Sequence, residues 1–358
     1  MRVTFLIGNG FDLNLGLRTT YKDFLENKYL IDYKNEKDPV IKKFKEFIIN
    51  SKGQSEDVGF GANYWKDVEI AFGESTNSQD LFQNGYEWQK CYDSFCDELL
   101  EYLKEEENKI NCEKLAQLFF NDIQNFYDKL FIDDAIGAQG IVKSEIKNCE
   151  FNFIDFNYTL IIDRLVEFND KFLQNDNSIG KVYHIHGDLN SGIILGVDNV
   201  GQVKNRSIFD PLGSYSLRHF VKPTSMDIKI PNIKNNAYRT IKASDIIIVY
   251  GCSLGDTDKT WRDYLCECIN NNKIVIITKK DELIKNNNVN SSKRDFLNAI
   301  EKTRDELAVK IHLYNYFETN GVKNINNSAR DTSDYYKNRY LKYGHLNLFK
   351  NLKQLPNN

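Results

Sequence analysis

The chain has 358 residues, of which 41% are hydrophobic and 27% charged, and its net charge is −4. This composition is typical of a globular protein with a hydrophobic core, and it argues against a nucleic-acid surface because phosphate contacts need clustered Lys and Arg. The sequence has no apolar run of about 18 residues and no signal-like start, and its seven cysteines lack a framework spacing, so we expect a cytoplasmic protein with no membrane segment and with reduced thiols.

The first predicted strand, Arg2–Ile7, ends at the turn Gly8-Asn9-Gly10-Phe11-Asp12. The glycines would let backbone amides approach a pyrophosphate closely, because glycine has no β-carbon. Asp12 would hold a ribose hydroxyl or only brace the loop. A plain tight turn is an equal alternative, because Leu13 stands where the dinucleotide fingerprint has its third glycine.

Residues 39–147 form long, charged, aromatic-rich amphipathic segments, which predict a helical insertion. Before them, Thr20 and Asp23 match a capping box that predicts the start of a helix. A cluster at Trp65, Asp67 and Glu69 would reach the site, or its carboxylates would simply be exposed on a helix. One apolar stripe at helical spacing predicts a buried face made of Cys91, Phe95, Leu99, Tyr102 and Leu103.

The run Phe151–Phe156 predicts a core strand that ends in the polar residues Asn157 and Thr159. In an open parallel sheet, ligands bind beyond the carboxyl ends of the strands, so these two residues are candidate site residues. The alternative is a turn at Asn157 followed by a helix, Leu160–Phe168, that Thr159 caps.

The next predicted strand, within Val182–Asp188, carries His184 and His186 on one face. A pair of metal ligands is one interpretation of that spacing, although the sequence shows no third and fourth ligand at a spacing typical of a metal site. The functional interpretation that we prefer makes His186, beside Gly187, a general base that titrates near the working pH. A hydrogen-bonded core histidine is the structural alternative.

A further strand is predicted at Ile193–Val197, and residues 199–240 lack periodicity, which predicts a loop or lid. The clearest strand, at residues 245–250, ends in Gly251-Cys252-Ser253-Leu254-Gly255-Asp256. The helix predicted at Lys259–Ile269 would favour phosphate or ribose oxygens at its amino end, with Ser253 as a donor. The same spacing partly matches a hydrolase nucleophile elbow whose base is unplaced.

The remaining predicted elements again alternate between strands and helices, at Lys273–Thr278, Arg294–Leu307, Val309–Tyr314 and Tyr335–Leu352. Alternation of this kind is typical of strands that are joined by helical crossovers. The sequence therefore predicts an α/β core with a doubly wound, mostly parallel, Rossmann-like sheet.

Four pieces, taken together, resemble the AbiH family of bacteriophage abortive-infection proteins, namely Gly8-Asn9-Gly10-Phe11-Asp12, Phe156-Asn157-Tyr158-Thr159, His184-Ile185-His186-Gly187 and Gly251-Cys252-Ser253-Leu254-Gly255-Asp256. That family is similar to a distant branch of the sirtuin-like NAD-binding fold, and the resemblance runs from residue 1 to about residue 280. The nucleotide-binding core would then comprise residues 1–38 and 148–358. The resemblance implies that Asn157 lies near the nicotinamide ribose and that His186 is catalytic. It implies nucleotide contacts from Gly8, Asn9, Gly10, Phe11, Asp12, Thr159, Gly251, Ser253 and Asp256.

Two departures from sirtuin deacylases narrow the expected reaction. Thr159 stands where those enzymes carry Asp, and the cysteines lack the paired spacing of their zinc module. The resemblance therefore implies that water cleaves NAD to nicotinamide and ADP-ribose without a metal. Asn157 would position the ribose hydroxyls or the water, and His186 would accept a proton.

Other functions stay open at this point. A non-catalytic module would sense NAD or a related nucleotide and signal by assembly, with a phage trigger, another protein or a second copy as its partner. The same glycine loops would serve that function. A serine hydrolase using Ser253 and a metal hydrolase using His184 and His186 are the remaining alternatives.

Overall fold

The computed structural model describes residues 1–51, 63–78, 80–126, 148–252, 258–270, 274–280 and 311–316, together with Leu352. Two predicted site residues, Ser253 and Asp256, lie outside these ranges. The helix predicted at Arg294–Leu307 lies outside them as well, and so does the one at Tyr335–Leu352 apart from its last residue.

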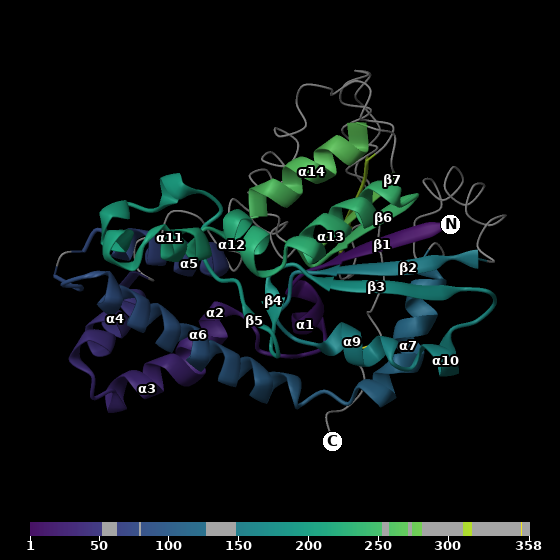
Figure 1. Ribbon diagram of the computed structural model, residues 1–358. Coiled ribbons are helices and arrows are strands. Elements are labelled where there is room, and N and C mark those ends of the chain that lie inside the picture. The colour runs from purple at the N-terminus through teal and green to yellow at the C-terminus, as the bar shows by residue number, and fades with distance from the viewer. Residues whose placement is uncertain are drawn as a thin grey trace, which may run out of the picture.

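A six-stranded sheet forms the centre of the molecule, with the strand order β3-β2-β1-β6-β7-β8 (Figure 1). Every neighbouring pair of strands is parallel. Parallel strands buried on both faces read as continuous apolar runs, which is why β1, β2 and β6 were recognisable in the sequence. The strand predicted within Val182–Asp188 instead begins at Ser178 and ends at His184, because β3 is only partly buried and its first half carries no apolar run. The strands are β1 (Arg2–Ile7), β2 (Glu150–Asp155), β3 (Ser178–His184), β6 (Ile246–Tyr250), β7 (Ile274–Lys280) and β8 (Ile311–Tyr316). The prediction of a mixed α/β fold with a parallel sheet is confirmed.

Helices cover both faces of this sheet. On β1, Phe5 faces one apolar cluster and Leu6 faces another, as the alternation of side chains along a strand requires. The Phe5 face packs against α7 (Cys112–Gln124) and α9 (Ile161–Val166). The opposite face packs against α13 (Pro231–Ala243) and α14 (Lys259–Asn270), of which α14 lies above the sheet in Figure 1.

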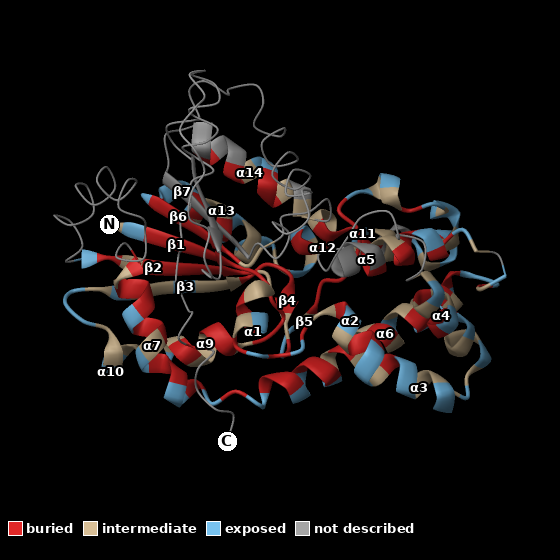
Figure 2. Cartoon of the chain, turned by 180° about the vertical axis from the view of Figure 1, so that it is seen from behind, coloured by how far each residue is buried: buried red, intermediate tan, exposed pale blue. Residues whose placement is uncertain are grey.

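A helical layer lies beyond the carboxyl ends of the strands (Figure 1). Its inner side is one aromatic-rich cluster, in which the predicted stripe of α6 (Gly85–Glu107) is buried (Figure 2). The capping box at Thr20 and Asp23 is also confirmed. The layer contains α2 (Tyr21–Phe24), a π-helical turn (Leu25–Tyr29), α3 (Leu30–Asn35), α4 (Pro39–Asn50), α5 (Asn63–Ser75) and α6.

The helices predicted within residues 39–147 are present wherever that range is described, yet they do not all lie in the helical layer. α7 belongs to this range and packs on β1 and β2 instead. The division into an insertion and a core stays a prediction. None of the helices in the described ranges combines the length and the apolar character that a membrane span needs.

The loop predicted at residues 199–240 is wrong. That stretch forms two 3₁₀ segments and three helices, of which α12 and α13 each begin with a proline in the first two helical positions. Proline is favoured there because its missing N–H has no partner in the first turn, so Pro223 and Pro231 start helices rather than break them. The elements are Val200–Gln202, Arg206–Leu212, α11 (Ser214–Phe220), α12 (Lys222–Lys229) and α13.

The strand predicted at Ile193–Val197 is also wrong beyond its first residue. Within this range Ile193 belongs to β5 (Gly192–Ile193), which pairs with β4 (Gly187–Asp188), and Val197 forms only an isolated parallel bridge with Val221. The apolar residues that follow are buried without a ladder, and a β-carbon at Gly196 would meet the Phe220 carbonyl oxygen at 1.9 Å. Burial, rather than strand pairing, explains this apolar run. The remaining short helices are α1 (Gly10–Asn14) and α10 (Asn169–Phe172).

Candidate functional site

The predicted site residues follow four neighbouring strands at one edge of the sheet. Asp12 follows β1, Asn157 follows β2, His186 follows β3 and Gly251 follows β6. Backbone hydrogen bonds continue past the strands, since Phe156 N–H donates to the Ile7 carbonyl at 2.8 Å. Parallel pairing therefore brings these four segments together, as the sequence predicts.

The glycines of the first and last of these turns pack against each other. Gly8 N–H donates to the Tyr250 carbonyl at 2.9 Å, and Gly10 N–H donates to the Gly251 carbonyl at 3.0 Å. A β-carbon on Gly10 would lie 2.5 Å from the Gly251 Cα, and Gly251 itself has a φ of +69°. These glycines are thus required by contact between two loops, whether or not a phosphate binds beside them.

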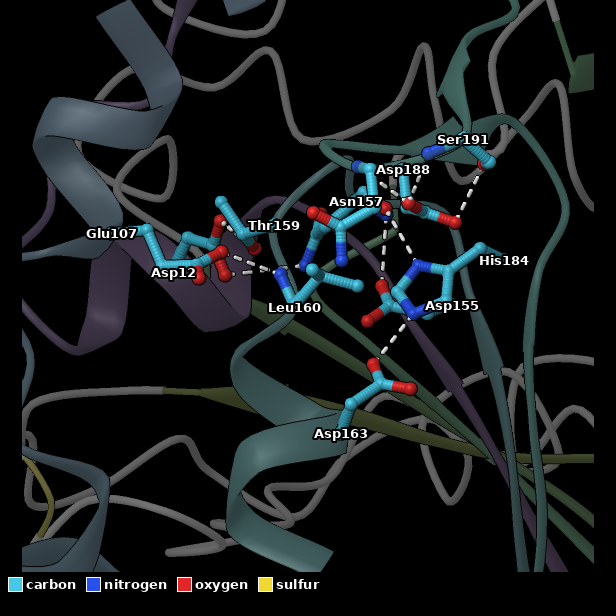
Figure 3. Close-up of polar contacts among 11 residues, drawn as sticks. Asp12, Glu107, Asp155, Asn157, Thr159, Leu160, Asp163, His184, Asp188 and Ser191 are labelled. Carbon is cyan, nitrogen blue, oxygen red and sulfur yellow. Dashed lines mark hydrogen bonds and ion pairs between the residues drawn. The ribbon is translucent and has the colours of Figure 1, made fainter.

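Asp12 braces the Asn157 turn. The Thr159 hydroxyl donates to Asp12 Oδ2 at 2.8 Å, and the Asn157 side-chain amide donates to Asp12 Oδ1 and to the Gly8 carbonyl, both at 3.3 Å (Figure 3). Burial and the neighbouring Asp155 raise the pKa of Asp12 well above its usual value. The cap predicted for Thr159 is wrong, because α9 has Leu160 at its N-cap and no side-chain cap.

His184 holds the same turn from the other side. Its Nδ1 lies 3.2 Å from the Asn157 carbonyl oxygen and its Nε2 lies 2.6 Å from Asp163 Oδ2 (Figure 3). Both partners are acceptors, so both ring nitrogens must carry a proton. Burial would lower the pKa of His184, but Asp163 and Asp155 outweigh it and raise the pKa to about 9. His184 is therefore an imidazolium at neutral pH and is unsuited to accept a proton.

The Asp155 carboxylate completes this arrangement. Asp155 Oδ1 accepts a hydrogen bond of 2.8 Å from the Asn157 backbone N–H, which closes the turn. Burial raises the pKa of Asp155 to about 7. We call Asp12, Asp155, Asn157, Thr159, Asp163 and His184 the Asn157 cluster.

His186 belongs to a different set of groups. Its Nε2 lies 3.2 Å from Asp258 Oδ1, although the two atoms are not aligned for a hydrogen bond, and its ring meets the edge of Phe156. The Lys222 ammonium lies 3.6 Å from the same Asp258 oxygen. It also lies 2.8 Å from Oε1 and from Oε2 of Glu69 on α5. We call Glu69, His186, Lys222 and Asp258 the His186 cluster.

The His186 cluster is a buried ion-pair network. Glu69 is 2% exposed, Lys222 4% and His186 5%. Burial favours the neutral form of Asp258, but Lys222 and His186 outweigh it and lower the pKa of Asp258. Burial likewise disfavours the charged Lys222, yet Asp258 and Glu69 raise its pKa above the ordinary value. Burial raises the pKa of Glu69.

Glu69 is buried, so the alternative of carboxylates exposed on a helix is wrong for Glu69, whereas the side chains of Trp65 and Asp67 lie outside the described part of the structure. His184 and His186 contact different carboxylates, and the described ranges contain no group of three or more His, Cys, Asp or Glu placed to hold a metal. Asn9 bonds to Thr19, and Phe11 packs into the core against Phe119 and Tyr250.

Sequence reasoning missed the partners of both histidines. Asp163 lies on a predicted helix and Asp258 closes the last glycine loop, so each was visible only as one acidic residue among many. Lys222 follows no motif, and it stands in a stretch that was wrongly expected to be a loop. A buried pairing between residues far apart in sequence leaves no local pattern from which it could be found.

A comparison with protein families supplies the identity of the chain. The family model of AbiH, described as bacteriophage abortive infection AbiH, matches residues 4–279, which is well over half of the sequence. The chain belongs to the AbiH family. The region matched by the AbiH model contains every residue of the Asn157 and His186 clusters. Membership of this family implies a role in abortive infection, a defence against bacteriophage. No curated protein matches the chain.

Proposed function

We propose that this AbiH protein hydrolyses NAD to nicotinamide and ADP-ribose with Asn157 and His186, in a doubly wound, sirtuin-like core. One observation carries the proposal: polar groups follow the carboxyl ends of β3, β2, β1 and β6, the four neighbouring strands around the centre of the sheet. From the central pair β1 and β6 the chain adds strands in opposite directions, with β2 and β3 on the β1 side and β7 and β8 on the β6 side. In doubly wound sheets dinucleotides bind in the crevice at that point.

The chemistry needs a base and oriented hydrogen bonds. Loss of nicotinamide leaves an electron-poor ribosyl centre, and an oriented water or hydroxyl adds to it as a proton is removed. Of the two histidines, His184 already holds both ring protons, which leaves His186 as the base. The Asp258 carboxylate, 3.2 Å from His186 Nε2, would stabilise the imidazolium that forms. The Asn157 amide would orient a ribose hydroxyl or the water.

The test measures nicotinamide and ADP-ribose released from NAD by the purified protein. We expect release by the wild type and its loss in Asn157→Ala and His186→Ala. The matched control is His219→Ala, which removes a histidine on α11 outside both clusters. Full turnover in both site variants would refute the assignment, and absence of release by the wild type at every NAD concentration would refute hydrolysis under those conditions.

A binding module that does not cleave NAD is the second candidate, and one observation favours it. Asn157 is 6% exposed, and its side-chain amide already donates to the Gly8 carbonyl and to Asp12. A purely structural Asn157 would serve a sensor as well as an enzyme. NAD binding in calorimetry with a change of assembly, but without nicotinamide release, would establish this candidate. Its partner would be a phage component or a second copy of the chain.

A further inference from the structure

The Lys222 ammonium is buried between two carboxylates from distant segments, Glu69 and Asp258. Glu69 comes from the helical layer on α5, and Asp258 stands directly before α14. The backbone of Lys222 is fixed as well, since its N–H donates to the Val197 carbonyl at 2.8 Å. A buried charge of this kind is costly unless its partners are held in place, so the position of the ammonium is well defined.

We propose that Lys222 and Glu69 are positioning residues that set the charge state of the His186–Asp258 pair, an inference that rests on the proposed role of His186 as the base. Neither residue needs to touch the substrate. Lys222 acts on His186 through the oxygen of Asp258 that both of them approach. Glu69 acts on His186 by holding Lys222.

The net charge of the His186 cluster depends on whether His186 is protonated. With a neutral His186, two carboxylates and one ammonium leave the cluster with one net negative charge. When His186 accepts a proton, the cluster becomes neutral. In a buried site the charge-balanced state is favoured, so the cluster stabilises the imidazolium that forms as His186 acts as a base.

The two positioning residues therefore act in opposite directions on His186. Lys222→Met removes a positive charge and leaves two carboxylates, which favours a permanently protonated imidazole. Glu69→Gln removes a negative charge and releases Lys222 toward Asp258, which disfavours the imidazolium. The double variant removes both charges at once and restores the original balance. Other titratable groups near the cluster, namely Tyr21, Tyr158, Asp198 and Cys252, are unchanged in all three variants.

The first experiment measures kcat/KM for NAD hydrolysis against pH in the wild type, Lys222→Met, Glu69→Gln and the double variant. We expect the acid limb of the profile to move up by about one pH unit or more in Lys222→Met and down by a similar amount in Glu69→Gln. In the double variant it should return to within a few tenths of a unit of the wild type. Loss of packing alone cannot produce shifts of opposite sign that cancel.

The second experiment does not depend on NAD hydrolysis, so it separates the failure of this inference from the failure of the proposed function. The protein has five histidines, and ¹³C-labelled histidine gives one resolved titration for each. The His186 signal is assigned by its loss in His186→Ala. Its titration midpoint should move up in Lys222→Met, down in Glu69→Gln, and back in the double variant. Midpoints that stay constant, or that move in one direction in both single variants, would overturn the proposal.

Discussion

The two histidines of the His-Ile-His segment lie two residues apart, yet they occupy opposite kinds of environment. The Asn157 cluster around His184 links segments that neighbouring strands bring together, and it holds a turn. The His186 cluster joins α5, α12 and the start of α14, which belong to different layers. The first cluster leaves its histidine with two acceptors, and the second leaves its histidine with one carboxylate. Two histidines only two residues apart can thus have separate functions, because the groups that surround each imidazole determine its charge.

The largest expected effect separates the two histidines by activity. His186→Ala should lower kcat/KM for NAD by about 10²-fold or more, the usual contribution of a general base, with a small change in melting temperature. His184→Ala should lower the melting temperature, because it releases Asn157 and Asp163 together. Assays of hydrolysis and thermal unfolding on both variants check this contrast. A His186→Ala variant that loses stability but keeps its turnover would contradict the separate roles of the two histidines.

The next expected effect concerns the stability of the His186 cluster. Lys222→Met alone should lower the free energy of unfolding by about 3 kcal/mol or more, because it leaves buried carboxylates without a cation. The double variant Glu69→Gln/Lys222→Met should recover most of that loss, since neutral side chains of similar shape replace the ion pair. Urea unfolding of the single and double variants measures both values. A double variant less stable than Lys222→Met would contradict the ion-pair explanation.

The Asn157 cluster predicts a pH dependence of stability. The pKa of His184 is raised from 6.5 to about 9, so its contribution is fully present below pH 6.5 and is lost as the pH rises through 9. Such a shift is worth about 3 kcal/mol. The raised pKa of Asp155, about 7, acts in the same sense at lower pH, between 3.8 and 7.

Urea unfolding at pH 6.5 and 9.5 tests the His184 contribution, with Asp163→Asn as the comparison. That variant removes the main favourable partner of the imidazolium, so its stability should change much less over this interval. An equal loss of stability in wild type and variant would assign the pH dependence to other groups.

The smallest expected effect concerns the hydroxyl that braces Asp12. Thr159→Val keeps the shape of the side chain but removes the hydrogen bond to the buried carboxyl, and should cost about 1–3 kcal/mol. Thr159→Ser keeps the hydroxyl and serves as the control. Thermal unfolding of both variants measures the difference. Equal melting temperatures for the two would mean that the hydroxyl does not stabilise the turn.

Much of the fold was predictable because the signals are local. The apolar runs of β1, β2 and β6 needed only their own residues, and so did the capping box at Thr20. The sequence also located the edge of the sheet at which the polar residues gather. The mistakes came from local signals with two meanings, since a proline both starts and breaks helices, and an apolar run such as Ile193–Val197 can be buried without forming a strand.

The sequence by itself determined the buried central strands β1, β2 and β6 and the chemical types of residue at their carboxyl ends. Only the tertiary structure decided which carboxylate faces which histidine. Hydrophobic periodicity arises when one helix or strand packs on a surface, so it can be recognised within a short stretch of sequence. An ion pair such as Lys222–Glu69 instead joins residues that are brought together only when two layers pack. Its partners are therefore set by the arrangement of distant elements rather than by the sequence around either residue.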